Sequence, residues 1–268
     1  MPCYFKDLGG QDCLFGDSKV SNSLLNAISL SVHFSFWFGL LLLHLFRHYI
    51  GPKLFYFLFY VKFKEPLSKV KVQQAVYPKE KQIQLEKHNI FKSQFSEFLI
   101  VLICLGLFKF GIIQLKFNGE GTSFLESAFV FFLLIFLQDT YFYFTHRMMH
   151  TKWFYRHIHL VHHRSVLTNP YTSFSMHPME KIIELLFFPF VLCLIPMTPN
   201  VLLLYIFMSS LINFIGHSGF EFNDLSKVPP NPLATTPTFH ERHHMTPNSN
   251  YALYLKFWDV LLDTRYRT

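Results

Sequence analysis

Residues 146–163 read HRMMHTKWFYRHIHLVHH, and residues 240–244 read HERHH. Residues three or four apart on a helix share a face, so the histidines in each run can point their imidazoles at one place. Imidazole is a good ligand for iron, copper, zinc and nickel. Eight such rings exceed the needs of one ion, so the pattern predicts two metals. The predicted ligands form three clusters: His146 and His150; His159, His162 and His163; His240, His243 and His244.

Each of the two H-x-x-H-H clusters is expected to form a half-collar of three ligands around one metal. His157 lies two residues before His159 and would point elsewhere on a helix, so it is excluded. His44 and His48 have the same spacing as His146 and His150 but no partner cluster nearby in sequence. We interpret this pair as interfacial histidines.

The composition predicts an integral membrane protein. Of the 268 residues, 51% are hydrophobic and only 15% are charged, against a usual share of about a quarter. Between Arg47 and Lys92 there are ten Lys or Arg against three Glu, which is typical of a cytoplasmic segment near anionic lipid. No basic patch stands apart from the apolar runs, so nucleic-acid binding is not expected. The four cysteines form no C-x-x-C pair, which argues against zinc–thiolate sites and a disulfide framework.

Long apolar runs predict an all-α protein with about four transmembrane or re-entrant helices. A patch at residues 54–61 is too short to span and is expected at the interface. The NGEG turn at residues 118–121 makes its two neighbouring spans an antiparallel hairpin. Residues 1–94 are expected to form a membrane anchor and basic segment, and residues 95–268 the catalytic domain. The first span is expected to be retained, because no cleavage site precedes it. The predicted spans are residues 27–46, 95–115 and 123–145, and a hairpin of residues 182–195 and 201–215.

Charge also predicts where the histidines lie. If the basic residues 47–94 are cytoplasmic, the next two spans leave and return, and the 182–215 hairpin does the same. All three clusters then meet on the cytoplasmic side, in a histidine-rich helical cap that holds a di-metal site. His177 and His217 lie on segments that return to this side. A lone histidine is usually structural, but two metals need about eight to ten ligands, so both are predicted to ligate.

Two carboxylates are predicted to support the ligands. Asp139 lies seven residues before His146, on the same helix face, and Glu180 follows His177 in SMHPMEK. Such a group accepts the second ring N–H of a ligand histidine and fixes its tautomer. The ligands lack both the thiolates of a copper site and the Glu-x-x-His pairs of a carboxylate-bridged bundle. Neutral imidazoles at a lipid surface favour two irons that activate dioxygen.

The motifs HRMMH, HIHLVHH, SFSMHPME, GHSG, HERHH and FWDVLLDT, in this order, resemble the fatty acid hydroxylase superfamily, the sterol desaturase group of membrane di-iron oxygenases. The run from Asp139 to Glu180 looks most like lathosterol oxidase, the C-5 sterol desaturase, and its bacterial relatives. The resemblance covers about residues 137–264. The ending departs from the usual W-D-x-L-F-G-T, since Leu262 and Asp263 precede Thr264.

This resemblance implies a non-haem centre of two Fe ions, which zinc can replace in preparations, on the cytoplasmic face. It supports the eight clustered histidines as ligands and strengthens the case for His177 and His217. It implies O2-dependent hydroxylation or desaturation of a lipid from the bilayer, sterol-like or fatty-acyl. The location would be the endoplasmic reticulum in a eukaryote or the inner membrane in a bacterium.

Electrons would come from a separate cytochrome b5-like or ferredoxin-like protein with its reductase, because no G-x-G-x-x-G is present. Members of the superfamily oxidise different lipids, so the resemblance does not name the substrate. Two other functions stay open: a histidine-rich metal transporter, and an inactive lipid-binding relative. A transporter places its ligands near the bilayer midplane, whereas these clusters lie at helix ends. Iron content together with oxygen consumption would distinguish an enzyme from a transporter.

Overall fold

The computed structural model describes residues 34–117, 122–222 and 233–266, and these residues are mostly helical. Within these ranges the extended backbone forms only isolated bridges, such as that between Lys71 and Phe220. Residues 34–45 are helical and continue into a series of short helices. The elements that follow are η1 Phe46–Ile50, α2 Gly51–Tyr56, η2 Phe57–Lys62, α3 Lys64–Leu67, η3 Ser68–Val70, α4 Glu80–Lys109, α5 Phe124–Met149, α6 Lys152–Phe154, η4 Tyr155–His159, α7 Leu160–His163, η5 Thr172–Phe174, α8 Pro178–Leu185, α9 Phe187–Leu194, α10 Pro199–Gly216, α11 Pro237–Met245 and α12 Phe257–Leu261.

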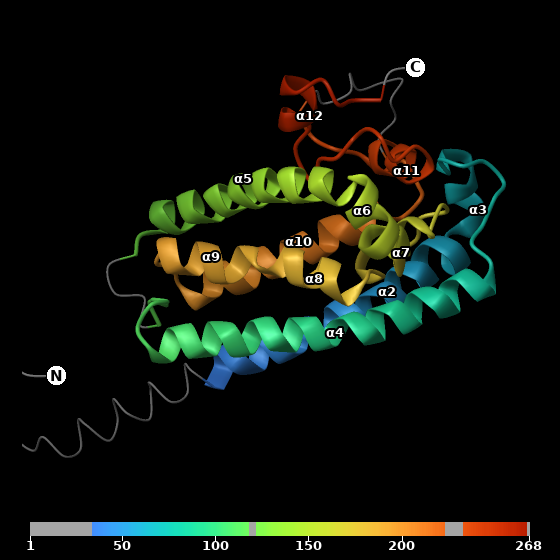
Figure 1. The fold of residues 1–268 in the computed structure, drawn as a ribbon. Coiled ribbons are helices and arrows are strands. Elements are labelled where there is room, and N and C mark those ends of the chain that lie inside the picture. The colour runs from blue at the N-terminus through green and yellow to red at the C-terminus, as the bar shows by residue number, and fades with distance from the viewer. Residues whose placement is uncertain (1–33, 118–121, 223–232, 267–268) are drawn as a thin grey trace, which may run out of the picture.

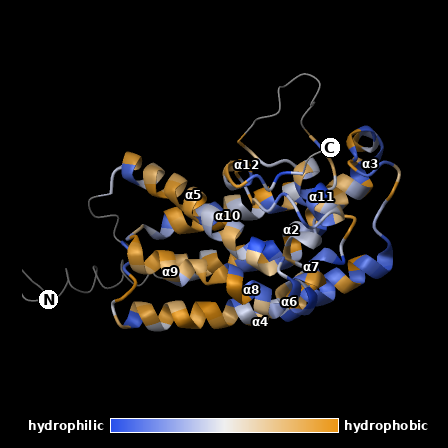
Figure 2. Ribbon diagram, turned by 45° about the horizontal axis from the view of Figure 1, so that its top comes forward, coloured by the Kyte–Doolittle hydropathy of each residue, from blue (hydrophilic) through white to orange (hydrophobic). Residues whose placement is uncertain are grey.

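Three helices, α4, α5 and α10, are long and apolar enough to cross a membrane. Their outward faces carry exposed aromatic rings, such as Phe95 on α4 and Phe124 on α5, with 76% and 84% of their surface accessible. Apolar surface on this scale is typical of contact with lipid or with another protein. Figure 2 shows the apolar residues along α4, α5 and α9, and the polar residues near α6, α7 and α11.

The predicted spans agree with these helices in part. The predicted span 123–145 is α5, and the predicted hairpin is α8 and α9, a turn, and then α10. Of the predicted first span, residues 27–33 lie outside the described residues, as do the NGEG turn, Cys3 and Cys13. The starts of α5, α10 and α11 follow from local sequence, because the side chains of Ser123, Thr198 and Thr236 each accept a backbone N–H of the first turn.

Helix α4 begins 15 residues before the predicted span at residue 95 and runs through residue 94 without a break. Its polar first half has a buried face that includes Ile83, Glu86 and Ile90, with the three- and four-residue spacing of a helix. The length of α4 therefore depends on the packing of its polar first half against the rest of the protein as well as on its apolar second half.

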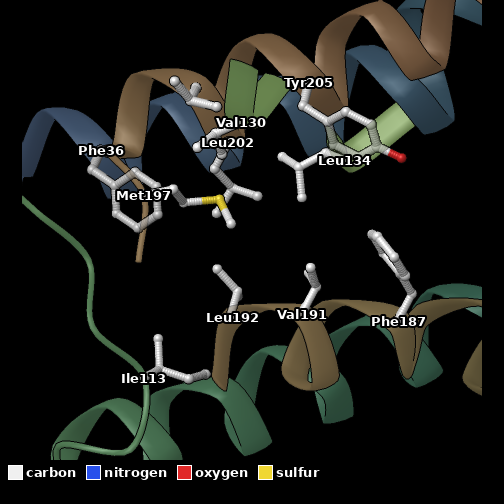
Figure 3. Packing of buried hydrophobic residues seen from close by; sticks show 11 residues of the cluster. Phe36, Ile113, Val130, Leu134, Phe187, Val191, Leu192, Met197, Leu202 and Tyr205 are labelled. Carbon is white, nitrogen blue, oxygen red and sulfur yellow. The ribbon is translucent and has the colours of Figure 1, made fainter. Parts of the chain in front are cut away.

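A buried apolar cluster joins the helix at residues 34–45 to α5, α9 and α10, and Figure 3 shows its side chains meeting between the helices. A smaller cluster, which includes Ile83, Phe174 and Phe214, lies under the start of α4. The long helices run side by side, and α6, α7 and α11 gather at one end of the bundle (Figure 1). This arrangement brings segments that are distant in sequence to one end.

Candidate metal centre

Nine histidines converge at that end of the bundle. His146 lies in the last turn of α5 and His150 directly follows that helix, and the η4–α7 turn supplies His159, His162 and His163. His217 directly follows α10, and α11 supplies His240, His243 and His244. All are buried except His150, which is partly buried. The structure therefore brings together all the predicted ligands except His177.

The nine rings form two groups, and in each group one nitrogen of every ring lies within 4.8 Å of the others. In the first group, Nε2 of His146 is 3.1 Å from Nε2 of His159 and 3.2 Å from that of His150. In the second, Nε2 of His240 is 2.8 Å from that of His217 and 3.1 Å from that of His244. The first group consists of His146, His150, His159, His163 and His243, and the second of His162, His217, His240 and His244.

The half-collar prediction was wrong, because each triad is divided between the two groups. His159 and His163 lie in the first group, while His162 between them lies in the second. On α11, His240 and His244 lie in the second group and His243 in the first. Residues four apart are about 40° apart around a helix, whereas the residue between them points roughly 100° away from its neighbour. Each of these two turns therefore serves both groups.

Hydrogen bonds made by Nδ1 fix the tautomers of five of these histidines. The Nδ1 atoms of His146, His162, His217 and His243 each lie 2.6–3.1 Å from a backbone carbonyl oxygen, those of Tyr251, Ser175, Asn213 and Ser249 respectively. A carbonyl oxygen only accepts, so each of these Nδ1 atoms carries the hydrogen. Nδ1 of His159 similarly donates to Oε1 of Glu180, at 2.8 Å.

These tautomers leave lone pairs pointing at each other. His146 and His159 both carry their hydrogen on Nδ1, so their Nε2 atoms, 3.1 Å apart, cannot share a hydrogen bond. Such an arrangement is repulsive unless a cation lies between the nitrogens. At the ~2.1 Å metal–nitrogen distance usual for imidazole, two ligands at 90° are about 3.0 Å apart and two at the tetrahedral angle about 3.4 Å. These separations are close to those of two imidazole nitrogens bound to one ion, so the residues present fit a metal in each group.

The histidines outside the predicted spans are held neutral. Burial lowers the pKa of His162 to about 4 and that of His217 to about 3. It also lowers the pKa values of His159, His163, His240, His243 and His244 well below the usual 6.5. Neutral imidazole is the form that binds metal, so the site is ready for metals at physiological pH without losing protons.

The model of the family described as "Fatty acid hydroxylase" matches residues 131–264, half of the chain, and this segment contains all nine histidines. The chain belongs to the fatty acid hydroxylase family. The resemblance drawn from the histidine motifs is thereby confirmed.

The curated relatives within this family act on different compounds by name. Very-long-chain aldehyde decarbonylase GL1-5 of Oryza sativa subsp. indica is 33% identical over 46% of this chain and 21% of its own length. C-4 methylsterol oxidase erg25 of Schizosaccharomyces pombe is 31% identical over 49% of the chain and 45% of its own length. Methylsterol monooxygenase 1 of Rattus norvegicus is 32% identical over 48% and 43%. Each match therefore spans less than half of the relative, and no solved structure matches the chain.

Of the two predicted supporting carboxylates, only Glu180 contacts a clustered histidine. The prediction for Asp139 was wrong: its Oδ1 accepts the backbone N–H groups of Tyr254 and Leu255, at 2.7 and 3.1 Å. Asp139 thus fixes the segment after α11. Helical spacing placed Asp139 correctly on the face of His146. The same face also contacts a chain segment about 115 residues later, and the backbone N–H groups of that segment donate to the carboxylate.

The closing FWDVLLDT motif supports the site from outside. Asp259 accepts the backbone N–H groups of Tyr251 and Ala252, and Thr264 donates to the same carboxylate. The carbonyl of Tyr251 accepts the hydrogen bond that orients His146. By holding the backbone of Tyr251, the motif therefore helps to fix the orientation of His146. The departures at Leu262 and Asp263 leave these contacts in place.

Two other carboxylates that sequence reasoning missed hold the segment after α7. Glu86 on α4 accepts hydrogen bonds from Ser165, Asn169 and Thr172, and Glu241 on α11 accepts from Thr168. Nothing in their local sequence distinguishes them from solvated glutamates, because the partners that they hold after α7 are 73 residues or more away.

His177 lies outside both groups. It precedes α8, and its Nδ1 accepts the backbone N–H of Met179 at 3.2 Å, so it caps that helix. The expectation that it binds metal does not agree with this position. His157 is exposed and donates to the carbonyl of Trp153, in agreement with its exclusion. His44 and His48, interpreted from sequence as interfacial histidines with no partner cluster nearby in sequence, form a third close group with Glu97 of α4.

Proposed function

We propose that this protein is a membrane-bound non-haem di-iron oxidoreductase that uses O2 and external electrons to hydroxylate or desaturate a lipid C–H bond. The observation that carries the proposal is the convergence of Nε2 lone pairs in two adjacent groups of five and four histidines. Iron supplies redox chemistry that zinc lacks, and bound there it would activate O2. Membership of the fatty acid hydroxylase family supports the same chemistry.

The protein's own residues have three tasks in this proposal. In five of the nine rings, Glu180 and the backbone carbonyls hold the hydrogen on Nδ1, which keeps Nε2 of those rings available as a ligand. The buried setting of the rings excludes bulk water from them. A cavity bordered by histidines of both groups and by apolar side chains, among them Phe142 and Phe188, gives a lipid chain a place beside them.

The membrane and its orientation belong to this proposal. We place residues 95–109 of α4, all of α5 and α10, and the arm of the hairpin formed by α8 and α9 in the bilayer. The histidine end lies on the cytoplasmic side with residues 47–94, which are rich in Lys and Arg. Electrons would come from a separate protein, cytochrome b5-like or ferredoxin-like. For hydroxylation, one C–H bond, O2, two electrons and two protons give an alcohol and one water. For desaturation, two C–H bonds on adjacent carbons, O2, two electrons and two protons give an alkene and two waters.

The test is metal analysis and oxygen uptake on protein purified from membranes. After anaerobic loading we expect about two irons per chain, and O2 uptake that requires both a reductant and added lipid extract. The product should be 16 mass units heavier than its lipid for hydroxylation, or two units lighter for desaturation. Less than one metal per chain would contradict the proposal. Metal movement into vesicles without O2 uptake would instead indicate a transporter.

A further inference from the structure

A mostly apolar cavity lies between the helix at residues 34–45, α4, α9 and α10. Of the nineteen described residues that line it, only three are polar: His44, Arg47 and Glu97. Ligand sites commonly have this character, with a few placed polar groups in an apolar wall that fix the orientation of the ligand.

This cavity adjoins the one at the histidines. Arg47 borders both cavities, and so do Leu185, Phe188 and Ile206. Histidines of both metal groups, among them His146, border only the second cavity. A molecule whose body fills the apolar cavity therefore has the Arg47 cluster at the end of that cavity nearest to the metal groups.

The polar residues form one bonded cluster on Glu97. Its Oε1 accepts a hydrogen bond from Nη1 of Arg47 at 3.0 Å. Its Oε2 is in short contact with Nε2 of His48, and Nδ1 of His44 lies 3.6 Å away. One carboxylate thus contacts a guanidinium and two imidazoles, and of these groups Arg47 and His44 line the cavity with Glu97.

Two nitrogens of the cluster are buried without a hydrogen-bond partner among the described residues: Nε of Arg47 and Nδ1 of His48. Buried polar atoms in native proteins nearly always have a partner, and leaving one without it is costly. Since Arg47 borders both cavities, an oxygen atom of a bound molecule can supply the missing acceptor.

The charges of the cluster select a neutral ligand. The Glu97 carboxylate offsets the Arg47 guanidinium and would repel a second carboxylate or a phosphate. A dication is disfavoured by the Arg47 guanidinium, which is hydrogen-bonded to the same carboxylate. A hydroxyl suits the site, because it can donate to a Glu97 oxygen and accept from Nε of Arg47.

We propose that Arg47 and Glu97, with His44 and His48 beside them, form a binding site for the hydroxyl group of a neutral lipid alcohol whose apolar body fills the adjoining cavity. In a bound alcohol, the carbons adjacent to the hydroxyl-bearing carbon are then the ones that face the histidines. That consequence rests on the proposed function, whereas the binding itself does not.

The test measures binding to the full-length, metal-loaded protein in detergent. Two arms distinguish a sterol from a chain: cholestanol against its 3-methyl ether, and octadecanol against its methyl ether and stearate. We expect the alcohol of at least one arm to bind about tenfold or more tightly than its ether, and octadecanol to bind more tightly than stearate, since the ether cannot donate to Glu97 and the acid is repelled by it. Equal binding of alcohol and ether in both arms, or tighter binding of stearate, would overturn the proposal.

Variants locate the effect. Arg47→Met/Glu97→Gln removes both charges together, so neither is left buried and alone. It should bind the ethers as the wild type does and lose the preference for the alcohol, whereas the exposed Arg156→Met control should keep that preference. Retention of the preference by the double variant would overturn the proposal. A third metal per chain that Glu97→Gln removes would also overturn it, in favour of a cation site.

The two proposals fail separately. If the alcohols bind with the expected preference but iron-loaded protein consumes no O2 with any lipid, the proposed function is wrong and the binding site stands. If O2 uptake is found but alcohol and ether bind equally in both arms, the enzyme assignment stands and the hydroxyl site is wrong.

Discussion

Glu180 gives the sharpest test of the metal centre, because it touches a clustered histidine without belonging to either metal group. Its side chain is buried on α8, and its Oε1 accepts the Nδ1–H of His159 at 2.8 Å. Glu180→Leu removes the acceptor. Glu180→Gln keeps an acceptor oxygen at the same position but replaces the carboxyl group by an amide.

The expected magnitude follows from that single contact. A buried donor that loses its partner costs about 1–3 kcal/mol, which corresponds to roughly a 5- to 150-fold loss of metal affinity. Loss of such outer acceptors typically costs about 10–100-fold. We therefore expect Glu180→Leu to weaken metal binding in the first histidine group by about 10–100-fold, and Glu180→Gln by about tenfold or less.

The assay is competition with a chelator of known affinity, with metal per chain measured at each chelator concentration. Glu184→Gln is the matched control, because Glu184 lies one turn further along α8 and borders the same cavity, yet no histidine donates to it among the described contacts. Wild-type metal affinity in Glu180→Leu, or an equal loss in Glu184→Gln, would refute the reasoning from the tautomer.

Three further predictions follow from ligation, pH and topology. His163→Ala and His243→Ala should each lower iron content and reduce activity at least 100-fold, while His157→Ala keeps both; equal losses in all three variants would contradict the ligand set. For metal-free protein the thermal midpoint should fall as the pH drops from 7.5 to 5, since the unfolded chain takes up protons below about pH 6.5, whereas burial holds the folded pKa of His162 at about 4. Each such histidine then costs up to about 1.4 kcal/mol per pH unit, and a midpoint that stays constant over this range would count against neutral buried imidazoles. Reporter fusions between α4 and α5 and at the C-terminus should report opposite sides of the membrane, and the same side for both would contradict the proposed orientation.

Spacing along the sequence predicted most of the histidines that converge, because it fixes which side chains share a helix face. His146 and His150 are four apart, as are His159 and His163, and each pair stays within one group. Spacing could not predict which residue of a triad joins the second group, because that depends on where α10 and α11 pack. The position of His217, directly after α10, is of this kind.

Hydrogen bonds to backbone N–H groups explain the errors over Asp139 and His177. Helical spacing correctly placed Asp139 on the face of His146, but its partners are backbone N–H groups 115 residues later. His177 precedes a proline, and Pro178 begins α8, so its ring caps the helix rather than facing a metal group. In both cases the side chain accepts a hydrogen bond from a backbone N–H group that is close in space. The spacing of residues in the sequence does not predict such a bond.

His44 and His48 show why equal spacing leads to different chemistry. They are four apart, as His146 and His150 are, and the structure gives both pairs close partners. The partners of His146 are three more imidazoles besides His150, whose convergent lone pairs need a cation between them. The partner of His48 is the Glu97 carboxylate, which Arg47 already neutralises, so that no positive ion is needed there. The spacing determines that two rings face the same way, and the charge of the groups opposite them determines whether a metal or a neutral molecule completes the site.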